Sequence, residues 1–419
     1  MSNNRVLVPV SHPLGGIRTY MLYNFRCIHN SGYRFTFLSQ SGSVFDSFKK
    51  DVESWEGTEF INVTKNTGSV GVIRELRRVL SESSFCLIHS QGLKAGTETA
   101  IANLFKRVPH IITLHDVIIP QNDIPGHFKN LKKFIISRTT KRATVIIPVS
   151  HDCEQNHIQN FPAWKNGTVR IETIVNGIDV ERLDNSRNIF ESADETETTK
   201  ETELQVDQIL QHRLRNRFDI GEGVIVGGFF GRFMPQKGFD ILLNALSILA
   251  CKGYRDRFRL IATRDTHGYL SETINETMRD ANVSAMVKFV DLVPDIVPLL
   301  LQVDLMVMPS RWEACPLLPM ESLVLGVPVV GSDCIGLREV LQNTPSIVVK
   351  NDNAESLADG IIKFIETQKN NNAKNYIPEA KKRFNVIDAA NKLLEIYNSM
   401  NNPNTKSTTN RTKKPKLQM

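Results

Sequence analysis

The chain has 419 residues, which is too long for one ordinary hydrophobic core, so we expect two domains of typical size. Hydrophobic residues make up 41% of it and charged residues 23%, a composition typical of globular proteins. The six cysteines form no C-x-x-C pair, which argues against a disulfide framework or a zinc site. The first apolar run is too short for a signal peptide or a membrane anchor, so the sequence predicts a cytoplasmic protein.

The net charge of +6 is unevenly distributed along the chain. Residues 1–180 hold 21 Lys or Arg against 14 Asp or Glu, whereas residues 181–400 hold 25 against 31. Residues 401–419 hold five cations and no acid. The positive first half could face an acidic acceptor or an anionic membrane surface, and ordinary solvated charge is the alternative. We expect no nucleic-acid partner.

A short apolar strand at residues 6–10 is followed by a turn that ends in Gly15 and Gly16, and a helix follows over residues 17–27. Glycines after a first strand let the backbone approach a ligand closely at the carboxyl edge of a sheet. The turn does not spell the dinucleotide-binding pattern G-x-G-x-x-G. Taken alone, the two glycines therefore indicate only an α/β domain.

Strands and helices then alternate, which predicts a parallel sheet with helices on both faces and ligands beyond the strand carboxyl ends. His115 directly follows one strand, at residues 110–114, and is the candidate for chemistry in this half; a structural histidine is the alternative. The other expected elements are strands at residues 33–38, 85–89 and 145–150, and helices at residues 70–81, 93–106 and 129–142.

The helix expected at residues 129–142 carries six cations, with Phe134, Ile135 and Ile136 among them. Such a basic amphipathic helix could lie on anionic lipid, and a plain exposed face is the alternative. Residues 191–203 hold six acids and one lysine and no large apolar residue, so we expect a flexible insertion there.

In the second half, Arg232 follows a strand expected at residues 224–230, and Lys237 precedes a helix expected at residues 239–249. Arg232 offers a fork of donors and Lys237 a compact charge, and both types of group bind phosphates. Two unrelated surface cations are the alternative. No acidic cage accompanies them, so the sequence predicts charge stabilisation without a metal ion.

A further strand is expected at residues 305–308, and Glu313 lies between it and a helix expected at residues 318–325. The backbone N–H groups of Leu317 and Leu318 at the start of this helix form a candidate anion site. Glu313 and Glu321 would flank the anion and accept hydrogen bonds from hydroxyl groups, which indicates a sugar-bearing ligand. For Glu321 alone, the alternative is an acid favoured by the helix dipole.

The spacing Glu313-x7-Glu321, followed by GVPVVGSD and Gly336-Leu337-Arg338-Glu339-Val340, resembles the donor-binding signature of the retaining glycosyltransferase family 4. The segment GGFFGRFMPQKGFDILLNAL, residues 227–246, resembles a second element of that family. The resemblance implies the α/β GT-B fold, with two facing Rossmann-like, doubly wound domains. It also implies retaining, metal-independent transfer of a hexose from a nucleotide-diphosphate sugar to a glycan or lipid-linked acceptor, in cell-surface polysaccharide or glycolipid synthesis.

The resemblance assigns roles to the candidate residues. Arg232 and Lys237 would meet the leaving phosphate, Glu313 the sugar hydroxyls and Glu321 the ribose. His115 would contact the donor sugar, the backbone at Val290 and Leu292 the base, and the Gly15–Gly16 loop the pyrophosphate and acceptor. One departure is that Arg264-Asp265-Thr266-His267-Gly268 replaces a glycine-rich turn, so the sequence does not specify the nucleotide.

We expect an acceptor-side domain at residues 1–180, a linker with the acidic insertion at 181–219 and a donor-binding domain at 220–385. A terminal helix at 386–400 would cross back to the first domain, and residues 401–419 would form a disordered basic tail. The basic segments also predict peripheral attachment to the inner face of a membrane. The alternative functions are a nucleotide-sugar 2-epimerase and an inactive nucleotide-sugar-binding subunit.

Overall fold

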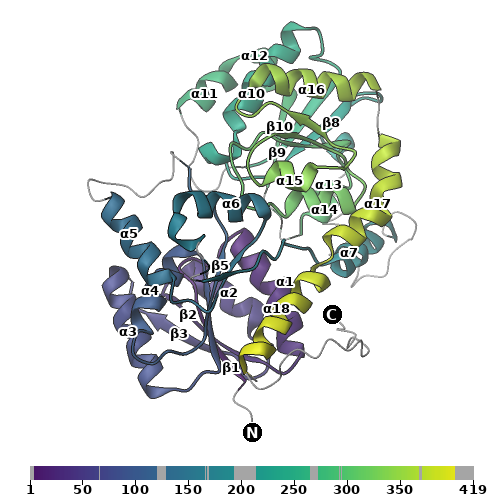
Figure 1. Ribbon diagram of the computed structural model, residues 1–419. Coiled ribbons are helices and arrows are strands. Elements are labelled where there is room, and N and C mark those ends of the chain that lie inside the picture. Colours follow the sequence, from purple (N-terminus) through teal and green to yellow (C-terminus); the bar gives the residue numbers. More distant parts are fainter. Residues whose placement is uncertain are drawn as a thin grey trace. The chain divides into compact units, whose positions relative to one another are not determined.

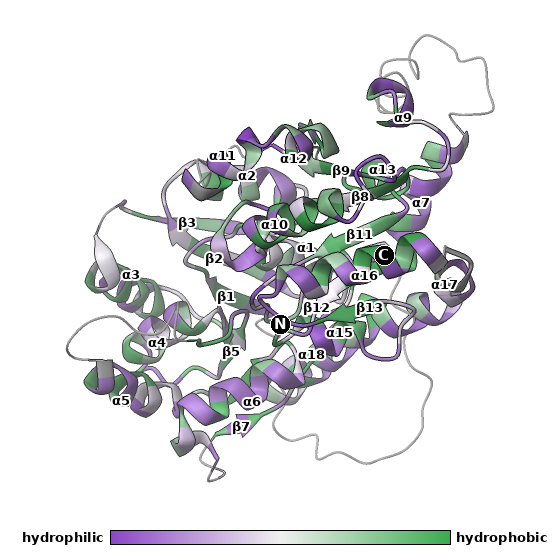
Figure 2. Cartoon of the chain, turned by 90° about the horizontal axis from the view of Figure 1, so that it is seen from above, coloured by the Kyte–Doolittle hydropathy of each residue, from purple (hydrophilic) through white to green (hydrophobic). Residues whose placement is uncertain are grey.

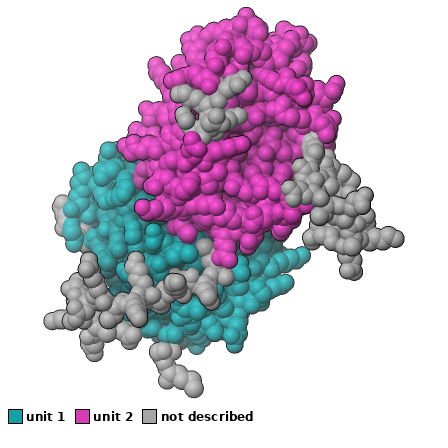
Figure 3. Space-filling model, turned by 90° about the vertical axis from the view of Figure 1, so that its right-hand side faces the viewer, with its two compact units in different colours: residues 1–177, 386–419 teal, residues 178–385 magenta. Residues whose placement is uncertain are grey.

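The chain divides into two compact units in a computed structural model (Figure 3). Unit 1 comprises Met1–Gly177 and Val386–Met419, and unit 2 comprises Ile178–Asn385. The structure describes residues 4–65, 67–119, 129–165, 167, 169–192, 214–264, 272–291, 293, 295–367 and 370–401.

Unit 1 is built on a seven-stranded parallel sheet in the order β3-β2-β1-β4-β5-β6-β7 (Figure 1). The strand order reverses between β1 and β4, so this is a doubly wound sheet with its ligand-binding edge at the strand carboxyl ends. The strands are β1 (Arg5–Pro9), β2 (Arg34–Gln40), β3 (Glu59–Val63), β4 (Leu87–Gln91), β5 (His110–Leu114), β6 (Val145–Pro148) and β7 (Arg170–Ile171).

Apolar residues point to both faces of this sheet because successive side chains of a strand alternate. In β1, Val6 and Val8 belong to one hydrophobic cluster and Leu7 to another. Helices α1 (Gly16–Asn30), α2 (Ser43–Val52) and α18 (Val386–Asn401) pack on the Val6 side, and α3 (Gly68–Glu82) and α4 (Leu93–Ala102) pack on the Leu7 side. Helix α5 (Lys129–Thr140) lies beside α4, and α6 (His151–Asn160) follows β6.

Unit 2 is built on a six-stranded parallel sheet in the order β10-β9-β8-β11-β12-β13, and its order reverses between β8 and β11. Its strands are β8 (Ile225–Phe229), β9 (Phe258–Thr263), β10 (Val287–Val290), β11 (Leu305–Met308), β12 (Val329–Ser332) and β13 (Ile347–Val349). One hydrophobic cluster joins the sheet to α10 (Phe239–Cys251), α11 (Glu272–Arg279), α12 (Ala281–Met286) and α16 (Ala354–Thr367).

The other helices of unit 2 include α7 (Val180–Ser192), which contacts α13 (Val297–Leu300) and α14 (Leu318–Val324). Helix α17 (Asn370–Phe384) packs against α14. Unit 2 also contains two short α-helices, α9 (Leu214–Arg217) and α15 (Leu337–Leu341).

The predicted α/β architecture of two doubly wound sheets is confirmed, and the strands expected at residues 110–114 and 305–308 have those bounds. The helix expected at 93–106 ends at Ala102, because the Asn103 side chain hydrogen-bonds the N–H and the carbonyl of Val108.

The terminal helix expected at residues 386–400 is present as α18. The helical run breaks at Asn385, between α17 and α18, because the Phe384 carbonyl accepts a hydrogen bond of 2.7 Å from the Ile178 N–H instead of continuing the helix. Helix α18, beyond this break, packs with unit 1. The expected linker at 181–219 begins inside α7, and most of the acidic insertion and the basic tail lie outside the described residues.

Within the described parts of the chain, no helix combines the length and the apolar character that crossing a bilayer requires.

Candidate functional site

The carboxyl edge of the unit 2 sheet gathers most of the candidate residues. Strands β8 and β11 are paired neighbours at the point where the strand order reverses. Arg232 follows β8 and Glu313 follows β11, so both lie at the place where open α/β sheets bind ligands. The topology therefore brings together two segments that are about 80 residues apart in the chain.

Lys237 and Glu313 form an ion pair at this edge. Lys237 ends the short 3₁₀ helix η3 (Pro235–Lys237), and its Nζ donates to Glu313 Oε1 at 2.6 Å. The Ser310 hydroxyl donates to the same oxygen at 2.9 Å. Glu313 is only 6% exposed, and a buried carboxylate needs such partners to offset its loss of water. The sequence did not predict the contribution of Ser310.

Two glycines hold the loops that carry this pair. Gly238 has φ +68°, and a Cβ there would lie 2.1 Å from the Pro309 carbonyl oxygen. Gly336 has φ +78°, and a Cβ there would lie 2.2 Å from the Glu313 carbonyl oxygen. Both positions need glycine, because its missing Cβ permits the positive φ and the close approach of the second backbone. Gly238, directly after Lys237, and Gly336, which contacts the Glu313 carbonyl, thus fix the backbone at both residues of the pair.

Arg311 also fixes this loop, a role that its sequence position does not predict. Its two terminal nitrogens donate to the Asp240 carboxylate at 2.9 and 2.7 Å, a bidentate pair with fixed geometry. Burial alone would raise the pKa of Asp240, but the hydrogen bonds and charge of Arg311 outweigh it and hold this pKa below its ordinary value. The Arg311 backbone N–H donates to the Gln236 carbonyl at 2.8 Å, which joins the loop to η3.

Glu321 lies inside α14 and is 7% exposed. Helix α14 begins at Leu318 without a side-chain cap at Leu317, and the Glu321 N–H donates to the Leu317 carbonyl at 3.0 Å. A second residue without a predicted role, Arg182 of α7, lies with its Nη2 4.0 Å from Glu321. Arg182 also donates to Asp295 at 3.2 Å, so it connects α7 with the loop that follows β10.

The predicted contact with the nucleotide base falls at the margin of the sheet. Val290 ends β10, which β9 separates from β8, and its carbonyl accepts a hydrogen bond of 2.8 Å from the Arg264 N–H. Leu292 lies outside the described residues, as do positions 265–268 of the unusual turn.

In unit 1, His115 directly follows β5 and is half-buried. Its Nε2 lies 2.8 Å from Gln91 Oε1, and its ring packs edge-on against Tyr20 with the centroids 4.7 Å apart. Desolvation lowers the pKa of His115 to about 3, so the imidazole is neutral at ordinary pH. A neutral ring that donates to Gln91 through Nε2 keeps Nδ1 as an acceptor.

The Gly15–Gly16 loop joins β1 to α1 in the same unit. Gly15 has φ +58° and caps α1, so this backbone conformation favours glycine there. A Cβ at either glycine would meet no atom of the described residues within 4 Å. The loop therefore leaves room at the carboxyl edge for a ligand.

Across the described ranges, the structure holds no group of three or more His, Cys, Asp or Glu residues arranged for a metal ion.

Two family models match the chain. The model "Glycosyltransferase Family 4" matches residues 14–182, and "Glycosyl transferases group 1" matches residues 211–383. Together they cover the described candidate residues of both units.

Three known proteins are similar to the chain. The lipopolysaccharide core biosynthesis mannosyltransferase LpsB of Rhizobium meliloti is 26% identical over 181 residues, or 41% of this chain and 51% of that protein. The putative teichuronic acid biosynthesis glycosyltransferase TuaC of Bacillus subtilis is 25% identical over 290 residues, or 67% of this chain and 62% of that protein. The chain thus matches between half and two thirds of the length of LpsB and of TuaC.

The third is a crystal structure of Anabaena Alr3699/HepE in complex with UDP-glucose, which has the same fold. It covers 94% of this chain and 99% of its own, with a TM-score of 0.72 and 21% identity.

Proposed function

The chain belongs to the group 1 glycosyltransferases, and from that premise we propose that it transfers a hexose from a nucleotide-diphosphate sugar to a glycan or lipid-linked acceptor. The transfer would retain the anomeric configuration and serve cell-surface polysaccharide or glycolipid synthesis. The observation that carries the proposal is the Lys237–Glu313 pair, 2.6 Å long, at the point where the unit 2 strand order reverses.

Each partner of this pair suits a different part of the donor. Lys237 and Arg232 would stabilise the negative charge that develops on the leaving phosphate, since preorganised cations act on charge as it forms. Glu313 would accept hydrogen bonds from sugar hydroxyls. A bound donor supplies an anion for Lys237 and hydroxyls for Glu313, so both side chains keep a partner when their mutual contact is replaced.

The remaining candidates support the same donor. Glu321 in α14, with Arg182 4.0 Å away, is assigned to the ribose, and the Leu317 and Leu318 amides to the phosphates. Val290 and Leu292 are assigned to the base, and His115 to the donor sugar as a neutral hydrogen-bonding group. The Gly15–Gly16 loop is assigned to the pyrophosphate and the acceptor. We propose that no metal ion takes part, because Arg232 and Lys237 supply the positive charge.

The names of the relatives favour a cell-surface acceptor. LpsB is named for lipopolysaccharide core biosynthesis and TuaC for teichuronic acid biosynthesis. The HepE structure contains UDP-glucose, which makes UDP-glucose the first donor to test here.

We also propose a cytoplasmic protein attached peripherally to an anionic membrane surface through α5. Leu131, Phe134 and Ile135 of this helix are 53%, 64% and 43% exposed, and the exposed cations Lys132 and Arg138 accompany them. Figure 2 shows hydrophilic and hydrophobic residues together along α5. Leu131 and Phe134 lie in the first half of a crossover helix, which begins at the carboxyl edge of the sheet, and Ile135 directly follows Phe134. Attachment there would hold the ligand-binding edge near lipid-linked acceptors.

A thermal-shift screen of UDP-, GDP-, ADP- and dTDP-sugars tests the donor assignment, followed by NMR analysis of the products. We expect one nucleotide sugar to raise the melting temperature, and its nucleotide diphosphate to be released as the sugar is transferred or hydrolysed. Conversion of the nucleotide sugar to its 2-epimer would instead establish the epimerase. No shift with any nucleotide sugar would contradict the proposal.

A further inference from the structure

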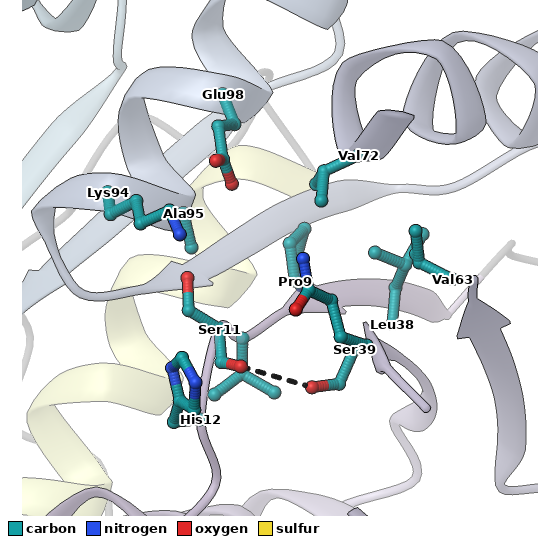
Figure 4. A pocket seen from close by; sticks show the side chains of 12 residues that line it. Pro9, Ser11, His12, Leu38, Ser39, Val63, Val72, Lys94, Ala95 and Glu98 are labelled. Carbon is teal, nitrogen blue, oxygen red and sulfur yellow. Dashed lines mark hydrogen bonds between the residues drawn. The ribbon is translucent and has the colours of Figure 1, made fainter. Parts of the chain in front are cut away.

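Unit 1 contains a pocket that none of the assigned residues lines (Figure 4). Behind its open mouth, the enclosed part has room for about one water-sized group. The pocket can therefore receive a hydroxyl group at the edge of a ligand. Its polar lining residues are Ser11, His12, Ser39, Gln40, Lys94 and Glu98.

The pocket lies at the ligand-binding edge of the seven-stranded sheet. Its walls are the carboxyl ends of β1, β2 and β3, the first turns of α4, and Val72 of α3. Ser11 and His12 belong to the turn that leads into Gly15 and Gly16. Because β1 adjoins the reversal of strand order, the pocket lies next to the expected ligand position of this unit.

Glu98 distinguishes the pocket from an ordinary gap between side chains. Its side chain extends from α4 toward the pocket in Figure 4, and the residue is only 4% exposed. Its Oε1 is buried and has no hydrogen-bond partner among the described residues. Burial raises the pKa of Glu98, against the opposing effects of Ser69 and Lys94. Burying a carboxylate oxygen without a hydrogen-bond partner is costly, which indicates that a ligand group donates a hydrogen bond to it.

The charges around the pocket select for a neutral ligand. Lys94 precedes Glu98 by one helical turn on the same face of α4, and both line the pocket. A ligand cation would meet Lys94, and a ligand anion would meet Glu98. A hydroxyl group both donates and accepts hydrogen bonds, so it can donate to Glu98 and accept from Lys94.

We propose that this pocket binds hydroxyl groups of the acceptor's terminal sugar, and that Glu98 determines acceptor specificity by accepting hydrogen bonds from them. The inference rests on the proposed function, because it takes the glycan acceptor as given. A site built to bond substrate hydroxyls discriminates strongly, since a ligand without them leaves buried polar groups unpaired.

Saturation-transfer difference NMR of the full chain, with UDP present, tests the pocket. The probes are the methyl glycosides of glucose, galactose and mannose. We expect at least one of them to bind, with its affinity reduced 10-fold or more in Glu98→Gln and in Ala95→Leu, which fills the pocket. Glu82→Gln removes an exposed glutamate from the neighbouring helix α3 and should leave binding unchanged.

Calorimetric titration with UDP keeps the two proposals separable. Both pocket variants should bind UDP with the parental affinity, because neither Glu98 nor Ala95 is among the residues assigned to the donor, and this also shows that they are folded. Failure of every glycoside to bind the parent chain, or equal binding by Glu98→Gln, overturns the pocket assignment. Failure of the parent chain to bind any nucleotide or nucleotide sugar contradicts the proposed function instead.

Discussion

The ligand-binding edges of the two sheets differ in how their polar side chains are charged. In unit 2, Lys237 pairs with Glu313 and Arg311 pairs with Asp240. In unit 1, uncharged groups meet where β4 and β5 end, a part of the sheet called the neutral edge: His115 bonds Gln91. A pyrophosphate is common to nucleotide-diphosphate sugars and needs cations at fixed positions, whereas acceptors vary and present mainly hydroxyls. The charged edge is therefore suited to an invariant ligand part and the neutral edge to a variable one.

The largest expected effect tests the charged edge. Arg232→Ala and Lys237→Ala should each lower turnover about 100-fold or more, as for removal of one preorganised charge-stabilising group. Steady-state release of the nucleotide diphosphate measures this loss. Lys252→Ala is the matched control, because Lys252 pairs with Asp359 on an exposed surface and should leave turnover unchanged.

Stability must be measured alongside turnover in these variants. Removing one partner of a buried ion pair costs about 3–5 kcal/mol, and Lys237→Ala leaves Glu313 without its cation. Because Lys237 is partly exposed, we expect a smaller loss, and turnover should be compared below the melting temperature of each variant. Parental turnover in both variants would show that neither cation meets the leaving group.

The second prediction tests the neutral edge by acid. Burial lowers the pKa of His110 to about 3, desolvation likewise lowers that of His115 to about 3, and His89 shifts in the same direction. The folded state keeps these rings neutral, while the unfolded chain takes up protons below its ordinary pKa of about 6.5. Stability is thus complete above about pH 6.5 and falls by about 1.4 kcal/mol per pH unit for each histidine as the pH drops below it.

Hydrogen exchange measured by mass spectrometry at pH 7.5 and pH 5.5, corrected for intrinsic rates, locates the loss. Peptides from β4 and β5 should lose protection at pH 5.5, whereas peptides from β8 and β11 should keep theirs. Equal changes in both sheets would show that the buried histidines do not set the acid response.

Local sequence patterns predicted the residues that one strand-loop-helix segment carries, and missed those that tertiary packing brings together. Lys237 and Glu313 were assigned because each follows a strand within a short motif. Arg311 and Asp240 are 71 positions apart, so only the folded sheet reveals their pairing. Arg182 lies near Glu321 because α7 packs on α14, and no spacing predicts that contact. Glu98 was missed because a helical glutamate is usually exposed, and its burial depends on α3 and β1, which pack against α4.

A third prediction concerns α5, where unit 1 exposes apolar residues beside cations. Replacing Leu131, Phe134 and Ile135 by serine should abolish salt-sensitive sedimentation with anionic liposomes, to which each nearby cation contributes about 1 kcal/mol. Ile189→Ser, at an exposed position of α7 in unit 2, is the control and should sediment like the parent chain. Equal binding of the parent chain to neutral and anionic vesicles, or to neither at low salt, would leave α5 as an ordinary exposed helix.

The smallest expected effect is that of removing divalent ions, and it tests whether the charges of unit 2 are sufficient by themselves. Arg232 and Lys237 would carry the positive charge that other enzymes obtain from a metal ion at the phosphates. Turnover should therefore remain at the parental rate in EDTA, measured as release of the nucleotide diphosphate. Activity lost in EDTA and restored specifically by magnesium or manganese would mean that the two cations are not sufficient. In that case the ion would have to be held largely by the donor phosphates and water, as magnesium often is.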